Sequence, residues 1–509
     1  MDETLRDNKN DPATTGRRHF LAQLTAAGAA ASAGVTLPAS AQEKGERPWM
    51  TQGSPDQVSV GETLANYAVN LKYEDLPPEV VRTAKRIIID TLGCAIGAYK
   101  AEPAQIAIKL ASNVSAKNGA TILCSGIKTS PDLAVFANGV MIRYLDFNDG
   151  YITLGSGHPS DTLAALLSPA ETGERSGRDL ILATVLAYEV FCKVLDVLDT
   201  RGIGLDHSTV TGLAAVVGAS RVMRLTQAQM VHAIGITVAG NVAINQGRVG
   251  TLSNWKACAA GEACRKAIFS AQLAQGGITG PSQVFEGRDG FFNVISHKPF
   301  KLPRLGGGGE AFGMMHSFTK RFALGQYSQT VAQAAVEARQ FFSNPAEIEE
   351  VNIRVSRSAI KVMADSPDKW RPQTHETADH SMPYSAGVAL MYGTIDGSHY
   401  EDPYLHDAKL LDLVSRVKCI PSEEADRREQ ELNLCDLEVV LKSGMRKAVR
   451  VEYHRGHWKN PMTDAEMEEK FRLLARKHLA ADRVDTLLRQ LWALENMPNV
   501  AALPALTRV

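Results

Sequence analysis

The chain has 509 residues and an apolar share of 44%, which is enough for two or more domains with a large buried core. Its formal net charge is −1 at pH 7 and no long run of one sign occurs, which excludes an acidic tail and gives no reason to expect a nucleic-acid partner. The seven cysteines form no Cys-x-x-Cys pair, which argues against a zinc ribbon or a cysteine-ligated iron–sulfur cluster and favours small buried apolar side chains.

The N-terminal segment has the three parts of an export signal. Arg17 and Arg18 lie in a twin-arginine pattern, a weakly apolar stretch follows over residues 24–37, and Ala39 and Ala41 form a small-x-small cleavage site. The stretch is too short and too rich in small residues for a good membrane span. The sequence therefore predicts a signal peptide over 1–41 and a linker over 42–57. We expect a bacterial periplasmic or exported protein with the twin-arginine export machinery as a partner of the precursor; a disordered alanine-rich tail is the alternative.

The chain from residue 58 to about 275 has the pattern of packed helices. Residues 80–92 show helical spacing after two prolines, and residues 180–198 form a long apolar segment without Pro or Gly. Residues 212–222 and 227–239 are rich in small side chains, which let helices approach closely. Because strand-like alternation is scarce here, we predict a large all-helical domain over 58–305.

The composition changes at the glycine run 306–309, which predicts a flexible joint. A phosphate-binding loop is the alternative, but no Lys-Ser/Thr pair follows. Strand patterns appear beyond the run, at 351–355 and in a hairpin of 437–441 and 448–453, with a helical segment at 330–341. The fold class is therefore mostly α, with a smaller α+β domain over 306–458. The final segment, 459–509, has helical spacing and is expected to return to the helical domain.

A polar loop between residues 146 and 161 is the first candidate site. Gly and Pro bound a group of short polar side chains that comprises Asp146, Asn148, Asp149, His158, Ser160 and Asp161. Ordered loops on a rigid scaffold often carry catalytic groups, and a histidine near carboxylates exchanges protons near neutral pH. The alternative is a surface turn in which Ser160 or Asp161 caps the apolar helix that follows.

Several short motifs then follow in one order: residues 144–149, 157–161, 207–209, 255–261, 319–322, 328–330, 378–384 and 456–462. Together they resemble the MmgE/PrpD family, whose members include 2-methylcitrate dehydratase and cis-aconitate decarboxylase. The resemblance covers roughly residues 55 to 500. It implies a large helical domain, a smaller α+β lid with the active site between them, a homodimer, and no metal or organic cofactor.

The resemblance also implies roles for particular residues. Lys256 and Lys320 match active-site lysines that hold or stabilise a carboxylate, and His158 is the first choice for acid–base work, with Asp146 to orient it. His207 is expected to bind a carboxylate or to protonate a leaving hydroxyl. Further candidates are Tyr384 and Asp149 for substrate binding, and Asp379 with His380 for support of the lid.

Residue type alone also allows purely structural roles for these candidate side chains. Lys256 could extend from a helix end, His207 could start a helix, and Tyr384 could be half-buried with a satisfied hydroxyl. The chain also departs from the family pattern. Gly150 stands where relatives usually have threonine, and Gly325 and Tyr327 replace a polar residue and a histidine.

The sequence thus predicts a cofactor-independent lyase, hydro-lyase in type, acting on a small di- or tricarboxylate. Proton transfer at a carbon beside a carboxylate is the expected chemistry. The alternatives are a decarboxylase, isomerase or epimerase on the same scaffold, or a non-catalytic carboxylate-binding protein of the envelope. The departures at Gly150 and Tyr327 leave the substrate open, because one lost hydrogen-bonding group changes specificity strongly.

Overall fold

The computed structural model describes residues 58–431 and 433–509, so the predicted signal peptide and linker lie outside the described residues. The helical part of the chain, from α2 to α11, confirms the predicted fold class. Its helices are α2 (Val60–Asn70), α3 (Pro78–Gly97), α4 (Glu102–Ala111), α5 (Pro131–Tyr144), α6 (Leu163–Thr172), α7 (Gly177–Leu195), α8 (Ser208–Val222), α9 (Gln227–Gly240), α10 (Trp255–Gln275) and α11 (Phe291–Val294). Two short antiparallel hairpins lie in the connections: β1 (Ala120–Thr121) with β2 (Lys128–Thr129), and β3 (Tyr151–Ile152) with β4 (Ser156–Gly157).

Local sequence signals set several helix starts. Pro78 takes the first position of α3, where its missing N–H is not needed. Ser176 and Asp179 form a capping box at the start of α7, and Thr226 and Gln229 form another at α9. The helices predicted over 80–92, 180–198, 212–222 and 227–239 are therefore confirmed as α3, α7, α8 and α9.

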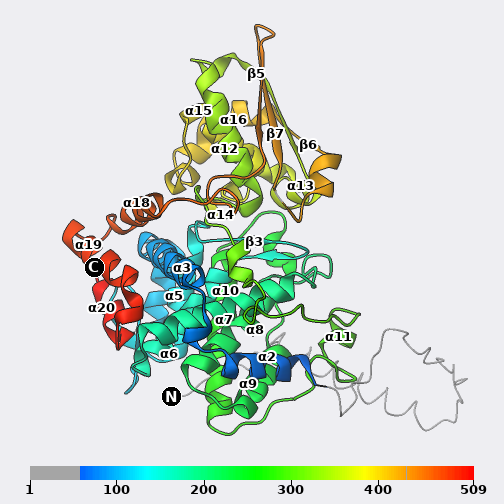
Figure 1. Ribbon diagram of the computed structural model, residues 1–509. Helices are drawn as coiled ribbons and strands as arrows, with labels where there is room; N and C mark the ends of the chain where they lie inside the picture. Colours follow the sequence, from blue (N-terminus) through cyan, green and yellow to red (C-terminus); the bar gives the residue numbers. More distant parts are fainter. Residues whose placement is uncertain (1–57, 432) are drawn as a thin grey trace, which may run out of the picture. The chain divides into compact units, whose positions relative to one another are not determined.

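Helix α10 packs between α5 and α8 in the helical part (Figure 1). The approach of α10 to α5 is close, since a Cβ atom on Gly139 would lie 2.5 Å from the Cα of Gly261. The C-terminal end of α5 leads into Asp146, and the first turn of α10 carries Lys256. This crossing therefore sets where two of the predicted site residues lie.

The glycine run 306–309 is a tight turn and not a free joint. Its last three residues have φ of 99°, 61° and 100°, a region that glycine occupies easily. Glu189 of α7 accepts backbone N–H bonds from Gly306 and Gly313, both at 2.7 Å. The predicted flexible joint is not supported, because the chain before and after the turn is bound to α7. The predicted domain limits themselves stay predictions.

The α+β part, from α12 to β8, contains a four-stranded sheet of order β6 (Val417–Pro421), β5 (Ile348–Val355), β7 (Cys435–Leu441) and β8 (Arg446–Val451). Strands β5 and β6 are parallel and the other pairs are antiparallel, and Gly444, with a φ of 84°, lies in the predicted hairpin turn. Helices α12 (Gln329–Ala338) and α15 (Met382–Tyr392) pack against the sheet (Figure 1). The remaining helices are α13 (Arg357–Met363), α14 (His375–Ala378), α16 (Ala408–Ser415) and α17 (Glu423–Arg427).

Two helices of the last segment pack on the helical part. Helices α18 (Asp464–Ala475) and α19 (Ala481–Trp492) pack on α3, and α20 (Leu503–Leu506) follows. Gly93 and Gly97 of α3 leave room for Phe471 and Leu474 of α18, since a Cβ atom at either glycine would lie within 3.0 Å of those side chains. The chain end is thus part of the packing that supports the polar loop.

Replacing Lys470 of α18 by methionine should lower the free energy of unfolding by about 3 kcal/mol. The buried Lys470 Nζ pairs with Asp90 at 2.7 Å and donates to the main-chain oxygens of Phe147 and Lys320, at 2.7 and 2.9 Å. Methionine leaves these acceptors without a donor. Urea unfolding of this variant and of Lys477→Met, which changes an exposed lysine nearby, measures the difference. Equal unfolding midpoints would contradict the expectation.

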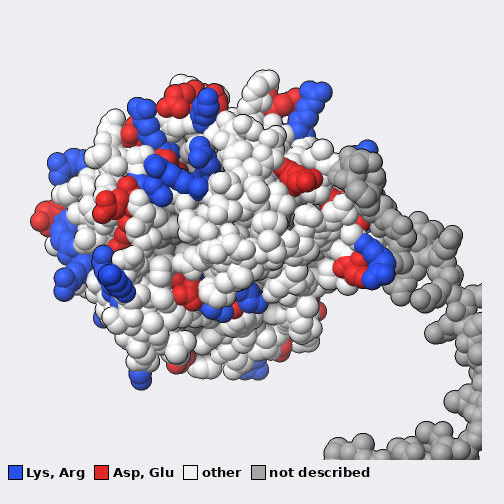
Figure 2. Space-filling view, turned by 90° about the horizontal axis from the view of Figure 1, so that it is seen from below, with Lys and Arg blue, Asp and Glu red and all other residues white. Residues whose placement is uncertain are grey.

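The surface in Figure 2 has few charged side chains over its middle and both signs around its margin, so lysine and arginine do not merge into one basic area on this face. No helix over 58–431 and 433–509 combines the length and hydropathy that a bilayer crossing requires.

All seven cysteines are free thiols, and five of them are buried. This confirms the prediction that most of them are small buried apolar side chains.

Candidate active site

Asp146 is the centre of a buried group of charges. It follows α5 with a φ of 46°, a left-handed conformation that aspartate tolerates better than most residues. Its Oδ1 accepts hydrogen bonds from Arg143 Nη1 (2.7 Å) and Lys320 Nζ, and its Oδ2 lies 3.3 Å from Lys256 Nζ. Burial alone would raise the pKa of Asp146, but these cations, Arg143 first, hold that pKa well below its usual range. The three predicted residues Asp146, Lys256 and Lys320 are therefore in direct contact.

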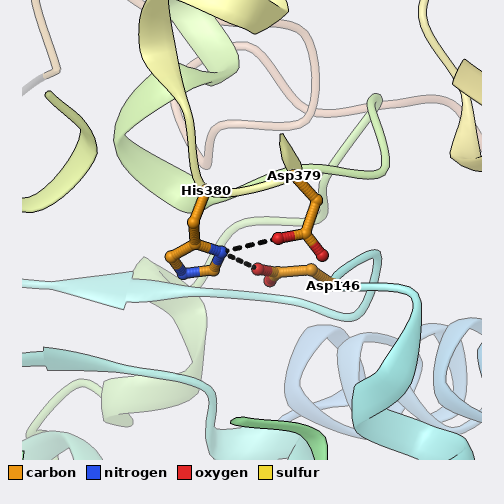
Figure 3. Close-up of side chains that lie close together, drawn as sticks. All are labelled: Asp146, Asp379 and His380. Atoms are coloured by element: carbon orange, nitrogen blue, oxygen red, sulfur yellow. Dashed lines mark hydrogen bonds and ion pairs between the residues drawn. The ribbon is translucent and has the colours of Figure 1, made fainter. Parts of the chain in front are cut away.

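The α+β part contributes Asp379 and His380 to the same group (Figure 3). His380 Nδ1 lies 2.8 Å from Asp146 Oδ2 and 2.9 Å from Asp379 Oδ1, and it donates a hydrogen bond to Asp379. Asp379 also accepts a hydrogen bond from Lys256. Burial and the charge of Lys256 lower the pKa of His380, so the ring is neutral at pH 7 with its proton on Nδ1. The helical and α+β parts thus meet at buried ion pairs.

These residues also have the spacing of a metal site, since one ligand atom each from Asp146, Asp379 and His380 lies within 4.8 Å of the others. Lys256 and Lys320, however, donate to the same carboxylates, and Arg143 adds a third cation. A divalent ion here would have to displace these cations or lie beside them, which costs free energy in a buried group. The donor set fits a salt-bridge network better than a metal centre.

His158 is held in one tautomer beside Arg143. Its Nδ1 lies 2.7 Å from the main-chain oxygen of Asp149, which can only accept, so Nδ1 carries the proton. Its Nε2 then accepts a hydrogen bond from Arg143 Nη2 at 3.0 Å. Burial and the charge of Arg143 lower the pKa of His158 well below its usual range. The ring is therefore neutral at pH 7, and its Nε2 lies 4.0 Å from Asp146 Oδ1.

Asp149, predicted to contact substrate, lies behind His158. Its carboxylate accepts hydrogen bonds from the backbone N and the Oγ of Ser160 (3.1 and 2.5 Å) and from the hydroxyl of Tyr188 (2.6 Å). Burial raises the pKa of Asp149 to about 7, although the Ser160 hydrogen bonds oppose this shift. Because its carboxylate and its main-chain oxygen are all engaged, the geometry supports a role in holding His158 and not a contact with substrate.

The loop residues that could have capped a helix do not do so. Pro159 begins a short 3₁₀ turn (Pro159–Thr162), and α6 starts only at Leu163. Asp161 Oδ1 instead accepts a hydrogen bond from Asn148 (2.8 Å), and Ser160 donates to Asp149. The reading of this loop as a surface turn with a capping side chain is therefore wrong, because its polar side chains are buried and bonded to one another.

His207 lies immediately before α8, with its ring 5.2 Å from the ring of His158. Two carboxylates flank it: Asp161 Oδ2 is 3.7 Å from Nε2, and Asp206 Oδ1 is 3.5 Å from Nδ1. Asp206 is itself paired with Arg248. Burial lowers the pKa of His207 even though Asp206 opposes the shift. The structure thus places His207 beside His158.

A cavity of about 360 Å³ lies against Lys256, and a second of about 500 Å³ lies between the β3–β4 hairpin and α13. Arg248 lines both cavities and donates to the main-chain oxygen of Lys256 at 2.9 Å. His158 and His207 line neither cavity. Both histidines are at most 5% exposed.

Tyr384 is not part of this charge group. It lies on α15, is 0% exposed, and donates its hydroxyl proton to the main-chain oxygen of His399 at 2.8 Å. Because α15 is apolar on all sides, the tyrosine ring is buried inside the α+β part, near the ring of Tyr400. The predicted substrate contact of Tyr384 is not supported by this arrangement.

The structure explains the glycine at position 150. Gly150 and Phe318 exchange two backbone hydrogen bonds of 2.9 Å, and a Cβ atom on Gly150 would lie 2.4 Å from the Phe318 ring. A threonine does not fit here unless Phe318 moves. Gly325 is similar, since its Cβ atom would lie 2.5 Å from Met363 Cε, and Tyr327 is buried beside the second cavity. Gly150 and Gly325 thus leave room for neighbouring side chains, and Tyr327 fills buried space beside the second cavity.

Sequence reasoning missed the buried charges of Arg143 and Lys369, and it named Asp161 only as a loop residue and possible helix cap. Arg143 contacts Asp146 and His158, and Asp161 faces His207. Lys369 is fully buried in the α+β part, 3.8 Å from Asp365, and its Nζ has no hydrogen-bond partner among the described residues. The available signal for Arg143 was its place in the apolar run of α5, one turn before Asp146.

Comparison with known proteins agrees with this architecture. Residues 62–303 match the MmgE/PrpD N-terminal domain and residues 322–494 match the MmgE/PrpD C-terminal domain. Similar proteins include 2-methylcitrate dehydratase of Escherichia coli, 26% identical over 422 residues that cover 77% of this chain and 85% of that protein. Cis-aconitate decarboxylase of Homo sapiens is 26% identical over 466 residues, which cover 88% and 95%, and the probable 2-methylcitrate dehydratase of Saccharomyces cerevisiae is 25% identical over 441 residues, which cover 80% and 84%. Because the two family matches span both the helical and the α+β part, the chain belongs to the MmgE/PrpD family.

Proposed function

We propose that the chain is a cofactor-independent lyase, hydro-lyase in type, that acts on a small di- or tricarboxylate. One observation carries this proposal: a neutral His158 lies beside a buried group that holds Arg143, Lys256 and Lys320. A neutral histidine can remove a proton, and buried cations stabilise the charge that then develops on a neighbouring carboxylate. The similarity to proteins named as dehydratases and a decarboxylase supports the same substrate class.

In the proposed reaction, Arg143 moves off His158 Nε2, and this nitrogen takes a proton from a carbon beside a substrate carboxylate. The electron pair of that C–H bond forms the new C=C bond. The C–O bond on the adjacent carbon breaks with its electron pair on oxygen. This oxygen takes a proton from the imidazolium form of His207, which becomes neutral, and leaves as water. Lys256 and Lys320 hold the carboxylates and offset the charge that develops on them.

Lys256 and Lys320 are already paired with carboxylates of the protein, so a substrate carboxylate has to displace one of these partners. Lys256 contacts Asp146 and Asp379, and Lys320 contacts Asp146. We propose that substrate enters when the α+β part opens, and that a substrate carboxylate then takes the place of Asp379 on Lys256. Opening and closing would exclude water from the reacting groups.

The test is to incubate purified protein with 2-methylcitrate, citrate and cis-aconitate, with and without a chelator. A hydro-lyase converts a hydroxy acid to an unsaturated acid, seen by ultraviolet absorbance. Carbon dioxide release would indicate a decarboxylase, and uptake of deuterium from solvent without net turnover would indicate an isomerase or epimerase. Binding without any of these changes would indicate a carboxylate-binding protein, and activity lost on chelation would contradict the cofactor-independent reaction.

Lys320 should set the upper limit of the pH profile. Burial lowers the pKa of Lys320 to about 8, although Asp146 opposes the shift. The cation is therefore present below pH 8 and is lost above it, so kcat/KM should fall there; His158, whose pKa lies below 6.5, stays a base down to more acidic pH. Measurement of kcat/KM against pH reports the groups of the free protein. Lys320→Arg keeps its charge and should move the fall to higher pH; a wild-type profile that is flat above pH 8 would contradict the assignment.

We also propose export by the twin-arginine route and assembly as a homodimer. The first rests on the pattern at Arg17 and Arg18 and the second on the family resemblance. Residues 1–45 fused to a reporter that is active only after export should give signal in a bacterial host. Replacing Arg17 and Arg18 by lysine should remove that signal, and unchanged export would contradict the proposal.

A further inference from the structure

Lys369 is a buried cation whose hydrogen-bonding capacity is unused. The residue is 0% exposed, and its Nζ has no hydrogen-bond partner among the described residues. The carboxylate paired with it, Asp365 Oδ1, lies 3.8 Å away, which is too long for a hydrogen bond. Burying an ammonium group in this way costs free energy, and burial accordingly lowers the pKa of Lys369. A lysine that lowers stability at a buried position indicates a functional role.

Lys369 lies near Asp379, the carboxylate that contacts Lys256. The 3₁₀ turn Pro367–Lys369 packs against α14 and α15, the two helices between which Asp379 lies. Ser381, two residues after Asp379, donates its hydroxyl proton to the main-chain oxygen of Lys369. After burial and the paired aspartate, the charges of Lys256 and Asp379 have the largest effects on the pKa of Lys369. Lys369 and Asp379 therefore belong to one packed unit of the α+β part.

The proposed binding step takes Lys256 away from Asp379, and a buried carboxylate that loses its cation is strongly destabilising. His380 stays hydrogen-bonded to Asp379 at 2.9 Å, but its ring is neutral. His375 Nε2 lies 3.8 Å from Asp379 Oδ2. Its Nδ1 donates to the Glu401 carboxylate at 2.8 Å, so in the neutral ring Nε2 carries no proton. Asp379 therefore needs another cation once substrate holds Lys256.

We propose that Lys369 receives Asp379 when a substrate carboxylate takes Lys256. This inference rests on the proposed function and adds a positioning residue to it. The Lys369 ammonium group gains a hydrogen bond that it lacks, and Asp379 keeps a cation while Lys256 holds substrate. The cost of breaking the pair of Lys256 and Asp379 is thereby partly offset. Lys369 thus raises substrate affinity without touching substrate.

A double-mutant cycle tests the exchange, with whichever of citrate, 2-methylcitrate and cis-aconitate wild-type protein binds most tightly. Affinity is measured as Kd by calorimetry, or as KM for an acid that is converted. Lys369→Met should weaken binding at least about tenfold, because Asp379 is then left without a cation. In the Asp379→Asn background the same change should alter affinity by no more than about twofold, since a neutral amide needs no cation. Lys369→Arg keeps the charge and should recover part of the affinity.

Lys409→Met, at an exposed lysine of α16 in the same part, is the matched control and should bind like wild type. Lys369→Met should not lower the urea unfolding midpoint, because it removes an unpaired buried charge. Lys369→Gln also removes the charge and replaces this variant if the methionine protein does not fold.

Equal losses of affinity in both backgrounds would mean that Lys369 binds substrate itself, and no loss in either would mean that it takes no part. Coupling of Asp379 to His375→Gln in place of Lys369→Met would make the histidine the receiver. Each of these results overturns the inference and, since the acid is still bound, leaves the proposed function standing. Wild-type protein that neither binds nor converts any of the three acids would overturn both.

Discussion

Replacing Lys256 by methionine should lower kcat/KM by at least about 100-fold, the usual cost of removing one charge-stabilising group from a reaction centre. Lys256 is 1% exposed, and its Nζ lies between two carboxylates, Asp146 at 3.3 Å and Asp379 in direct contact. In the proposed reaction this cation passes from Asp379 to a substrate carboxylate. Methionine keeps the length and apolar character of the side chain but removes the charge, so substrate binding and stabilisation of the developing charge are both lost.

The same change should also destabilise the fold, and the two effects have to be separated. Loss of one partner from a buried ion pair costs about 3–5 kcal/mol, because the remaining carboxylates are left without a cation. The double variant Lys256→Met with Asp379→Asn removes one of those carboxylates and should regain part of the stability without regaining activity. Lys266→Met is the matched control, since Lys266 lies on the same helix and lines the same cavity. Wild-type rates in a folded Lys256→Met protein would contradict the assignment.

Elements with strong local signals were predictable from the sequence. Helices α7 and α9 begin with capping boxes and carry long apolar runs, and the hairpin of β7 and β8 turns at a glycine with positive φ. The glycine run 306–309 was predicted to be a flexible joint, because glycine composition indicates a turn. Composition does not show whether that turn is hydrogen-bonded to another part of the fold. The backbone N–H groups of Gly306 and Gly313 donate to Glu189, which lies on a helix more than a hundred residues earlier in the chain. No local pattern could therefore reveal these hydrogen bonds.

Site residues that lie in short motifs could be predicted from the sequence. Residues whose role depends on which side chains are buried together could not. Asp146, His158, His207, Lys256 and Lys320 come from five separate segments, and the structure brings them into one neighbourhood. The position of Arg143 in an apolar run was a signal, but its partner could not be read from the sequence, because the contact depends on a left-handed Asp146. Tyr384 was assigned by motif alone, and the apolar surroundings of α15 direct its hydroxyl to the carbonyl of His399 instead.

Replacing His158 by glutamine should lower turnover by about 100- to 10,000-fold, the range expected for loss of a general base. Glutamine can still donate to the Asp149 oxygen and accept from Arg143, the two hydrogen bonds that hold the ring, at 2.7 and 3.0 Å. It cannot accept the substrate proton at neutral pH. The fold and the affinity for citrate should therefore be retained while the rate is lost.

Exchange of the substrate C–H proton with deuterated water gives the decisive readout for His158, because it follows proton removal even when no product forms. The variant should show no exchange above background, whereas His406→Ala, at a side chain that is 63% exposed, should behave like wild type. If His158→Gln kept wild-type exchange, the base would be another group. His380 would be the first to examine, since it is buried, neutral, hydrogen-bonded to Asp379 and in contact with Asp146. Because His380 belongs to the α+β part and His158 to the helical part, this result would also move the proton-transfer step to the other side of the site.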